Sequence, residues 1–259
     1  MKIISWNVNS IRVRINQIFE LLEEENPDIL CLQETKIVDD QFPIKELENR
    51  NYFSYFRGMP SYNGVAILSK SVARDSFSID FCDKSDARHI AVKIGDIEII
   101  SIYVPAGGDD PDPEVNPKFK HKLLFLKELL ELLKTKKKKR VILCGDLNIA
   151  PYEDDVWSHK QLINVVSHTK VETDKLIEIL EESNFSDSLR TFLSPPENVF
   201  TWWSYRSPNF ENNNRGRRLD HIWTSQPLRK SLINASILKK FRNKTKPSDH
   251  VPVRLEIRS

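Results

Sequence analysis

Acidic, amide and histidine side chains stand at the ends of four short apolar segments of this sequence. They are Asn7, Glu34, Asp146 with Asn148, and Asp249 with His250. Each acid taken alone is more simply explained as a turn former. Their recurrence at the ends of apolar runs suggests instead one site, because oxygen ligands of this kind suit a hard cation such as Mg²⁺. Such a cation assists phosphoryl chemistry, so the pattern indicates metal-dependent hydrolysis of a phosphodiester.

Runs of four to six residues rich in Ile, Val and Leu are typical of buried strands. Asn7, Glu34 and Asp146 follow such runs, whereas Asp220 and the pair 249–250 precede them. If the last two strands run antiparallel to the earlier ones, all of these side chains meet at one edge. The sequence therefore predicts a single site assembled from distant segments.

The bulk composition limits the classes of protein that fit. The 259 residues contain no linker-like segment, which predicts one domain over 1–259. No apolar run is long enough for a membrane span, and the first residues lack the pattern of a signal peptide. The three cysteines indicate reduced thiols in a cytosol. A net charge of +2 means that any nucleic-acid contact must come from a local patch.

Helical periodicity predicts helices over 11–25, 117–134 and 172–182, the first of them ended by Asn26-Pro27. Strand-like runs include 64–68, 89–94, 97–104 and 219–224. This alternation indicates a layered α/β domain with mixed sheets. An open parallel sheet fits less well, because no Gly-rich nucleotide loop follows a strand.

Six blocks of sequence, in order along the chain, resemble the exonuclease III family of bacterial AP endonucleases. They are 5–12 (SWNVNSIR), 32–36 (LQETK), 103–107 (YVPAG), 145–151 (GDLNIAP), 215–222 (RGRRLDHI) and 247–253 (PSDHVPV). That family lies within the endonuclease/exonuclease/phosphatase superfamily. The resemblance implies a DNase I-like four-layer α/β sandwich, in which two packed mixed β-sheets are flanked by helices.

The resemblance also implies a metal site. Glu34 is the expected principal Mg²⁺ ligand, with Mn²⁺ as a substitute, and Asn7 and Asp249 complete the coordination together with water. The wider ligand set that it implies adds Asp146, Asn148 and His250.

Catalytic roles follow from the same resemblance. Asp146 is the expected general base for the attacking water, and Asn148 helps to bind the phosphate. His250 donates to a non-bridging phosphate oxygen, and Asp220 orients its ring through the other nitrogen. Tyr103 is a phosphate-contacting tyrosine that acts as a phenolate. The other five histidines are expected to be structural.

DNA contacts are expected from Asn9, Trp202, Leu219, Arg215 and Arg217. Trp202 and Leu219 would wall a pocket for a flipped-out baseless sugar. Adjacent residues of a strand point to opposite faces, so Trp203 is expected in the core. The basic loop 212–218 suits phosphate contacts, and a solvated surface loop is the alternative.

The expected function is incision of duplex DNA 5′ to abasic sites, with 3′→5′ exonuclease and 3′-phosphodiesterase activity on blocked 3′ ends. The expected protein is a monomer of the bacterial cytosol, on the nucleoid when bound to DNA, without a membrane partner. Two alternatives are a phosphatase or sphingomyelinase of the same superfamily, and a non-catalytic DNA-binding module. Segment 152–171 departs from the enteric family pattern, which leaves the balance of endonuclease and exonuclease action open.

The most basic run of the chain, 134–140, is by its charge a candidate DNA-binding site. It immediately precedes the strand whose far end carries Asp146, so it should lie at the opposite edge of the sheet. It also ends a helix, where cations are stabilised by the helix dipole. We therefore expect a solvated surface there.

Overall fold

The computed structural model describes residues 1–206 and 210–258. Its strands form two six-stranded mixed sheets and one small two-stranded sheet. The first sheet has the order β13-β14-β1-β2-β4-β3. Its strands are β1 (Lys2–Asn7), β2 (Ile29–Gln33), β3 (Phe53–Arg57), β4 (Val65–Ser69), β13 (Leu232–Ile237) and β14 (Val253–Ile257).

The second sheet has the order β5-β6-β7-β8-β12-β9. Its strands are β5 (Asp75–Phe77), β6 (His89–Ile94), β7 (Ile97–Tyr103), β8 (Val141–Asp146), β9 (Phe185–Asp187) and β12 (Asp220–Ser225). The small sheet pairs β10 (Trp202–Trp203) with β11 (Gly216–Arg217).

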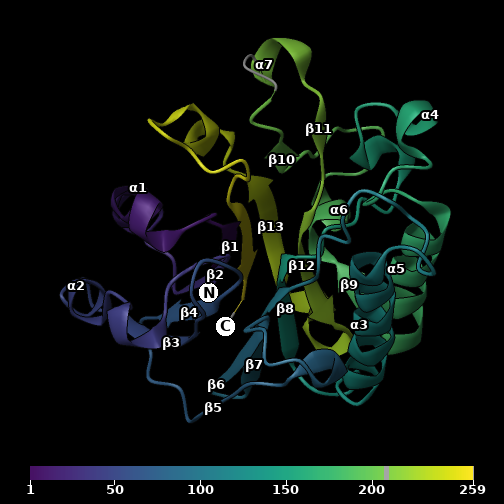
Figure 1. The fold of residues 1–259 in the computed structure, drawn as a ribbon. Helices are drawn as coiled ribbons and strands as arrows, with labels where there is room; N and C mark the ends of the chain where they lie inside the picture. Colours follow the sequence, from purple (N-terminus) through teal and green to yellow (C-terminus); the bar gives the residue numbers. More distant parts are fainter. Residues whose placement is uncertain (207–209, 259) are drawn as a thin grey trace.

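Helices cover the outer face of each large sheet, and Figure 1 shows α1 and α2 on one side with α3 and α5 on the other. The helices are α1 (Ile11–Glu25), α2 (Ile44–Glu48), α3 (Pro117–Lys134), α4 (His159–Leu162), α5 (Lys170–Ser183), α6 (Ser188–Phe192) and α7 (Phe210–Asn213). Short 3₁₀ turns are η1 (Asp39–Gln41), η2 (Phe81–Asp83), η3 (Glu153–Asp155), η4 (Gln226–Ser231) and η5 (Lys239–Asn243). Within the described part of the chain, no helix has the length and apolar character needed to cross a membrane.

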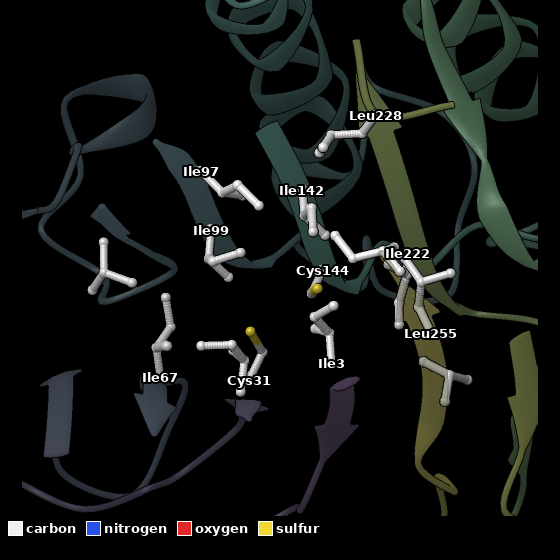
Figure 2. Close-up of a cluster of buried hydrophobic side chains, with 14 of the residues drawn as sticks. Ile3, Cys31, Ile67, Ile97, Ile99, Ile142, Cys144, Ile222, Leu228 and Leu255 are labelled. Atoms are coloured by element: carbon white, nitrogen blue, oxygen red, sulfur yellow. The ribbon is translucent and has the colours of Figure 1, made fainter. Parts of the chain in front are cut away.

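The inner faces of the two sheets pack directly on each other. Figure 2 shows Ile3, Cys31 and Ile67 of the first sheet meeting Ile99 and Ile142 of the second, all of them buried. Two further cores lie outside, one between the first sheet and α1 and the other between the second sheet, α3 and α5. The four-layer α/β sandwich with mixed sheets is therefore confirmed.

The helix boundaries have local causes. Helix α3 has the predicted bounds because the Asn116 side chain caps it, accepting from the backbone N–H of Lys118 at 3.0 Å, and Pro117 opens it. Helix α1 ends as predicted at Asn26, which adopts a left-handed conformation with φ 47°. Helix α5 begins two residues earlier than predicted, at Lys170, because Thr169 and Glu172 form a capping box.

Strand direction brings the polar residues together, as the antiparallel hypothesis required. Strand β12 runs antiparallel to β8, so that Asp220 is opposite Asp146. Strand β7 runs parallel to β8 and sets Tyr103 beside Asp146 on the other side. In the first sheet, β14 runs antiparallel to β1, which carries Asn7 at its end. One edge of the sandwich therefore gathers side chains from both sheets.

The basic run 134–140 lies at the opposite end of β8 from Asp146. Five residues of strand, 141–145, lie between the run and Asp146, a distance of roughly 17 Å at about 3.3 Å per residue. Several of its cations are already paired: Lys136 with Glu98 at 2.6 Å, and Arg140 with Asp96 at 2.6 Å. The expectation that this run lies away from the site edge is confirmed.

We predict that replacing the exposed Lys137, Lys138 and Lys139 together with Gln leaves the salt dependence of DNA binding nearly unchanged. Each phosphate contact contributes about −0.9 to the slope of log K against log salt. The measurement is that slope for a duplex with an abasic analogue, compared with the unmodified protein. A loss of about two contacts would show that this surface binds DNA.

Candidate active site

Glu34 follows β2 in a tight turn that the surrounding backbone holds from two sides. Its φ of 50° lies in the left-handed region, which a residue with a side chain adopts only when the fold requires it. The carbonyl of Glu34 accepts from Ser10 N–H at 2.8 Å, and the N–H of Thr35 donates to Gly64 O at 3.1 Å. The turn aims the carboxylate of Glu34 into the site edge.

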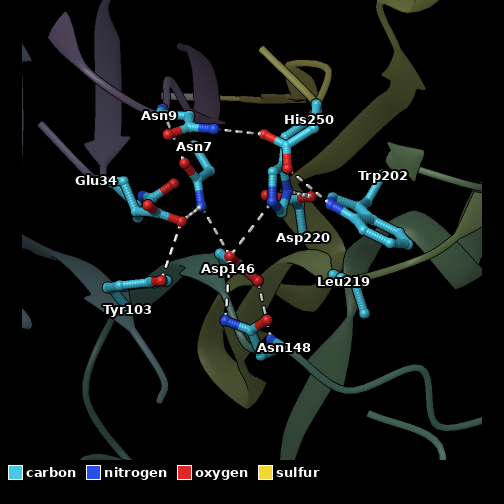
Figure 3. A network of polar contacts seen from close by, with 12 residues as sticks. Asn7, Asn9, Glu34, Tyr103, Asp146, Asn148, Trp202, Leu219, Asp220 and His250 are labelled. Carbon is cyan, nitrogen blue, oxygen red and sulfur yellow. Dashed lines mark hydrogen bonds and ion pairs between the residues drawn. The ribbon is translucent and has the colours of Figure 1, made fainter. Parts of the chain in front are cut away.

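Three ionisable side chains from different segments meet at this edge. Ligand atoms of Glu34, Asp146 and His250 lie within 4.8 Å of one another. The Asn7 amide joins the two carboxylates, donating to Glu34 Oε1 and to Asp146 Oδ2 at 2.8 Å each (Figure 3). Such a set of oxygen and nitrogen donors can bind a metal ion.

Asp146 is the most heavily hydrogen-bonded carboxylate of the group. Its Oδ1 accepts from the backbone N–H of Asn148 at 2.9 Å, and its Oδ2 accepts from Asn148 Nδ2 at 3.2 Å as well as from Asn7. Asn148 has φ 52°, and its amide also donates to Val104 O at 2.9 Å. The turn after β8 therefore brings Asn148 back onto Asp146.

His250 is oriented by a buried carboxylate. Its Nδ1 lies 2.8 Å from Asp220 Oδ2, which fixes this nitrogen as the donor and directs Nε2 toward Asp146 Oδ2 at 3.7 Å. The arrangement matches the predicted pairing of Asp220 with His250. When the ring is protonated, an imidazole held in this way also presents an Nε2–H donor toward Asp146.

The charges of this group act on one another through a poorly solvated environment. Burial raises the pKa of Asp146 to about 7, against the opposing charge of His250. Burial lowers the pKa of His250, but the charges of Asp220 and Asp146 outweigh it and raise the pKa to about 10. Burial also acts to raise the pKa of Glu34, yet Lys36 at 2.7 Å and the Asn7 amide bring it below its ordinary value. His250 is therefore an imidazolium that offsets part of the negative charge.

Tyr103 closes the group from the end of β7. Its hydroxyl donates to Glu34 Oε1 at 3.0 Å, and Arg88 lies over its ring at 4.7 Å. Burial raises the pKa of Tyr103 well above its ordinary value, and the charges of Glu34 and Asp146 add to the shift. The role of Tyr103 as a phosphate-contacting phenolate stays a prediction.

Asp249 lies outside the group formed by Glu34, Asp146 and His250. Its Oδ1 accepts from Asn9 Nδ2 at 3.0 Å, and its Oδ2 accepts from the Trp202 indole N–H at 3.0 Å. These contacts join the first loop of the chain to the small sheet. The assignment of Asp249 as a metal ligand stays a prediction.

A cavity of about 480 Å³ opens above these side chains. Trp202 and Leu219 form one apolar wall of it, Val165 and Val166 add further apolar lining, and Arg217 also lines it. Figure 3 shows Trp202 and Leu219 side by side, away from Glu34. Trp202 is half-buried whereas Trp203 is only 1% exposed, which matches the expected division of the two tryptophans between cavity and core.

The basic loop 212–218 divides into surface and core. Arg215 is exposed, and Arg217 is partly buried, donating to Ser167 Oγ at 2.6 Å. Arg218 is fully buried and pairs with Asp155 at 2.7 Å and Asp187 at 2.5 Å. The expectation that this loop offers its charges to phosphate is therefore wrong for Arg218, whose charge is already neutralised inside the fold.

Lys122 is a positioning residue that sequence reasoning missed. Its fully buried ammonium pairs with Glu172 at 2.5 Å and donates to Asn148 O at 2.8 Å and Ala106 O at 3.2 Å. It thereby fixes the turns after β8 and β7 to helix α3. The available signal was a lysine on the buried face of a predicted helix.

Of the histidines expected to be structural, four contact other groups of the protein: His89, His159, His168 and His221. His221 lies against Ile149 O at 2.9 Å, and His89 accepts from the N–H of Ile79 at 3.2 Å. His159 and His168 contact each other at 2.8 Å within segment 152–171. These contacts agree with their expected structural role.

Comparison with known proteins agrees with the geometry. The sequence profile of the Endonuclease/Exonuclease/phosphatase family matches residues 4–250. Exodeoxyribonuclease III of Haemophilus influenzae is 30% identical over 100% of both chains, and an exodeoxyribonuclease of Bacillus subtilis is 32% identical over 99% of both.

Solved structures give the same result. An AP endonuclease from Archaeoglobus fulgidus superposes with a TM-score of 0.94 at 34% identity, covering 100% of both chains. A 3′ phosphatase from Neisseria, bound to a product DNA hairpin, superposes with a TM-score of 0.93 at 32% identity over 100% of both chains. The chain therefore belongs to the endonuclease/exonuclease/phosphatase family and is similar over its full length to exodeoxyribonuclease III, as its six sequence blocks indicated.

Proposed function

We propose that the protein is a Mg²⁺-dependent DNA repair hydrolase that incises duplex DNA 5′ to abasic sites. We extend the proposal to 3′→5′ exonuclease and 3′-phosphodiesterase activity on blocked 3′ ends. The observation that carries it is the meeting of Glu34, Asp146 and His250 beneath a cavity with an apolar wall. The related AP endonuclease and the DNA-bound 3′ phosphatase support the same class of substrate.

The residues fit a divalent metal, because the carboxylates of Glu34 and Asp146 meet beside His250 with ligand atoms within 4.8 Å of one another. Glu34 and Asp146 would hold the ion, with Asn7, Asn148 and Asp249 as further predicted ligands and His250 at its side. When bound, Mg²⁺ supplies a positive charge to the phosphate and to the leaving oxygen. The Asn7 amide already holds the two carboxylates at a fixed spacing.

The chain's own groups would carry the proton and orient the phosphate. Asp146 takes a proton from the attacking water, whose oxygen forms a bond to phosphorus as the bond to the upstream O3′ breaks. A carboxylate with a pKa of about 7 suits this role near neutral pH. The His250 imidazolium and the Asn148 amide donate to non-bridging oxygens, and Asp220 keeps His250 in that orientation. The departing O3′ takes up a proton from solvent, so the products are an upstream 3′-hydroxyl and a downstream 5′-phosphate.

Trp202 and Leu219 would select the sugar. A baseless deoxyribose is a small and largely apolar ring, so the wall that they form can accept it once it leaves the helix. Asn9, Arg215 and Arg217 are the predicted contacts to the DNA around it. A non-DNA phosphoester would make no use of this wall.

We further propose that residues 1–259 act as one domain and one monomer in the bacterial cytosol. The family match over 4–250 supports the single domain, and the bacterial exodeoxyribonucleases to which the chain is similar support the compartment. The deciding experiment uses a labelled duplex with one tetrahydrofuran abasic analogue, incubated with Mg²⁺ and with chelator. Specific incision 5′ to the analogue is expected, and none on inositol phosphate or sphingomyelin.

Metal dependence generates a first prediction. Glu34→Ala, or excess chelator with the unmodified protein, abolishes incision because the principal ligand is lost. Binding to the abasic duplex, measured by fluorescence anisotropy, survives at least in part. Undiminished cleavage in chelator would overturn the metal assignment.

The assignment of Asp146 as the general base leads to another prediction. We expect Asp146→Asn to lower kcat by about 10²–10⁴-fold. The affinity for the abasic duplex changes little, because the amide keeps the size of the side chain. Single-turnover kinetics with saturating enzyme measure the chemical step directly. A kcat within a few-fold of the unmodified protein would require a different base.

The two adjacent tryptophans provide a matched pair. Trp202→Ala opens the sugar wall, so we expect weaker discrimination between abasic and intact duplex at nearly unchanged Tm. Trp203→Ala removes a buried ring and costs roughly 3–5 kcal/mol of stability. Incision assays on both duplexes and thermal melting of both variants test the assignment. Exchanged phenotypes would contradict it.

A further inference from the structure

A second cavity of about 320 Å³ lies beside the reaction cavity. The two cavities share Trp202, Arg206 and Arg217 in their linings, and the second adds Trp157 and Arg215. Its volume is at the lower end of the range for sites that bind small organic groups. The second cavity therefore continues from the wall that is proposed to hold the sugar.

Strand pairing builds this second cavity. Val156 pairs with Arg217 of β11, and the N–H of Trp157 donates to Gly216 O at 3.1 Å. Segment 156–157 thus extends the small sheet of β10 and β11. The Trp157 ring also packs against the apolar cluster that contains Val156 and Leu219. Its position is fixed by the fold, which is what a stacking surface requires.

The second cavity combines aromatic faces with positive charge. The Arg215 guanidinium lies 4.7 Å from the centre of the Trp157 ring, and Arg217 lies 5.5 Å from that of Trp202. No carboxylate is among the described residues that line it. Indole rings stack on nucleobases, and guanidinium groups bind phosphate, so this surface suits a nucleotide that carries its base.

We propose that the second cavity holds the base of the 3′-terminal nucleotide during exonuclease cleavage. The inference rests on the proposed function. In incision and in exonuclease action alike, the sugar on the 3′ side of the cleaved phosphate would lie against Trp202 and Leu219. An abasic sugar ends there, whereas an intact nucleotide has a base that needs its own space. The adjoining cavity supplies that space, with Trp157 as the stacking surface.

The test compares two reactions on duplexes of the same sequence: removal of an intact 3′-terminal nucleotide and removal of a 3′-phosphate. A 3′-phosphate carries no base beyond the cleaved bond, so its removal does not need the second cavity. We expect Trp157→Leu to lower the ratio of the first rate to the second by about 5- to 150-fold, the range expected for the loss of one stacked base. Trp157→Phe restores an aromatic face and recovers most of the ratio.

Tyr62→Leu is the matched control. It removes an exposed aromatic ring from a different cavity beside Tyr103. Any effect on rate is therefore common to both reactions, and their ratio stays as it was. An unchanged ratio in Trp157→Leu would overturn the proposal. If wild type shows neither reaction nor incision at an abasic analogue, the proposed function fails instead.

A binding measurement decides the matter if Trp157→Leu does not fold. A duplex with 2-aminopurine as its 3′-terminal base is titrated with folded Glu34→Ala protein, which has the Trp157 side chain but lacks the principal metal ligand. Stacking on the indole quenches the fluorescence of that base beyond the level seen when 2-aminopurine lies five nucleotides from the end. Equal quenching at the two positions would rule the second cavity out as the base site.

Discussion

The structure depends on holding several carboxylates close together where water is largely excluded. Glu34, Asp146 and Asp220 would repel one another, and the repulsion is strongest where the dielectric constant is low. Two features oppose it: the His250 imidazolium between Asp146 and Asp220, and the Asn7 amide between Glu34 and Asp146. Burial still raises the pKa of Asp146, and the charges of Asp220 and Glu34 add to the shift. A site of this kind is suited to bind positive charge and to accept a proton.

The surrounding fold holds the backbone that carries these groups. Lys122 with Glu172 fixes the turn of Asn148 to the helices, and Arg218 with Asp155 fixes the start of β12 to segment 152–171. A buried charge pair contributes little net stability, because desolvation offsets most of the attraction, but loss of one partner is costly. We therefore interpret these pairs as devices that position loops around the site. Glycines at close contacts act in the same way: a Cβ at Gly145 would lie 1.9 Å from Ile102 O, so β7 and β8 could not hold their spacing.

The sequence predicted the parts of this arrangement that local pattern controls. Apolar runs located the strands, helical periodicity located α3, and residues at strand ends located Glu34, Asp146 and His250. It could not separate Arg218 from Arg217, because both lie in one basic loop and only tertiary contacts with Asp155 and Asp187 make the first a core residue. Lys122 was missed for the same reason, since its partner Glu172 is 50 positions along the chain. The second cavity depends on strand pairing between 156–157 and β11, which no local sequence pattern predicts.

Asn7 lies on β1 and His250 just before β14, and these neighbouring strands pair across almost the whole sequence. During translation, the first strand must wait until β14 has left the ribosome before it gains that neighbour. Contacts so distant in sequence are slow to form, because a long chain must close before they are made. A nascent or prematurely terminated polypeptide would therefore carry Glu34 and Asp146 without His250. Such a polypeptide would lack both the antiparallel partner of β1 and the imidazole that lies beside Asp146.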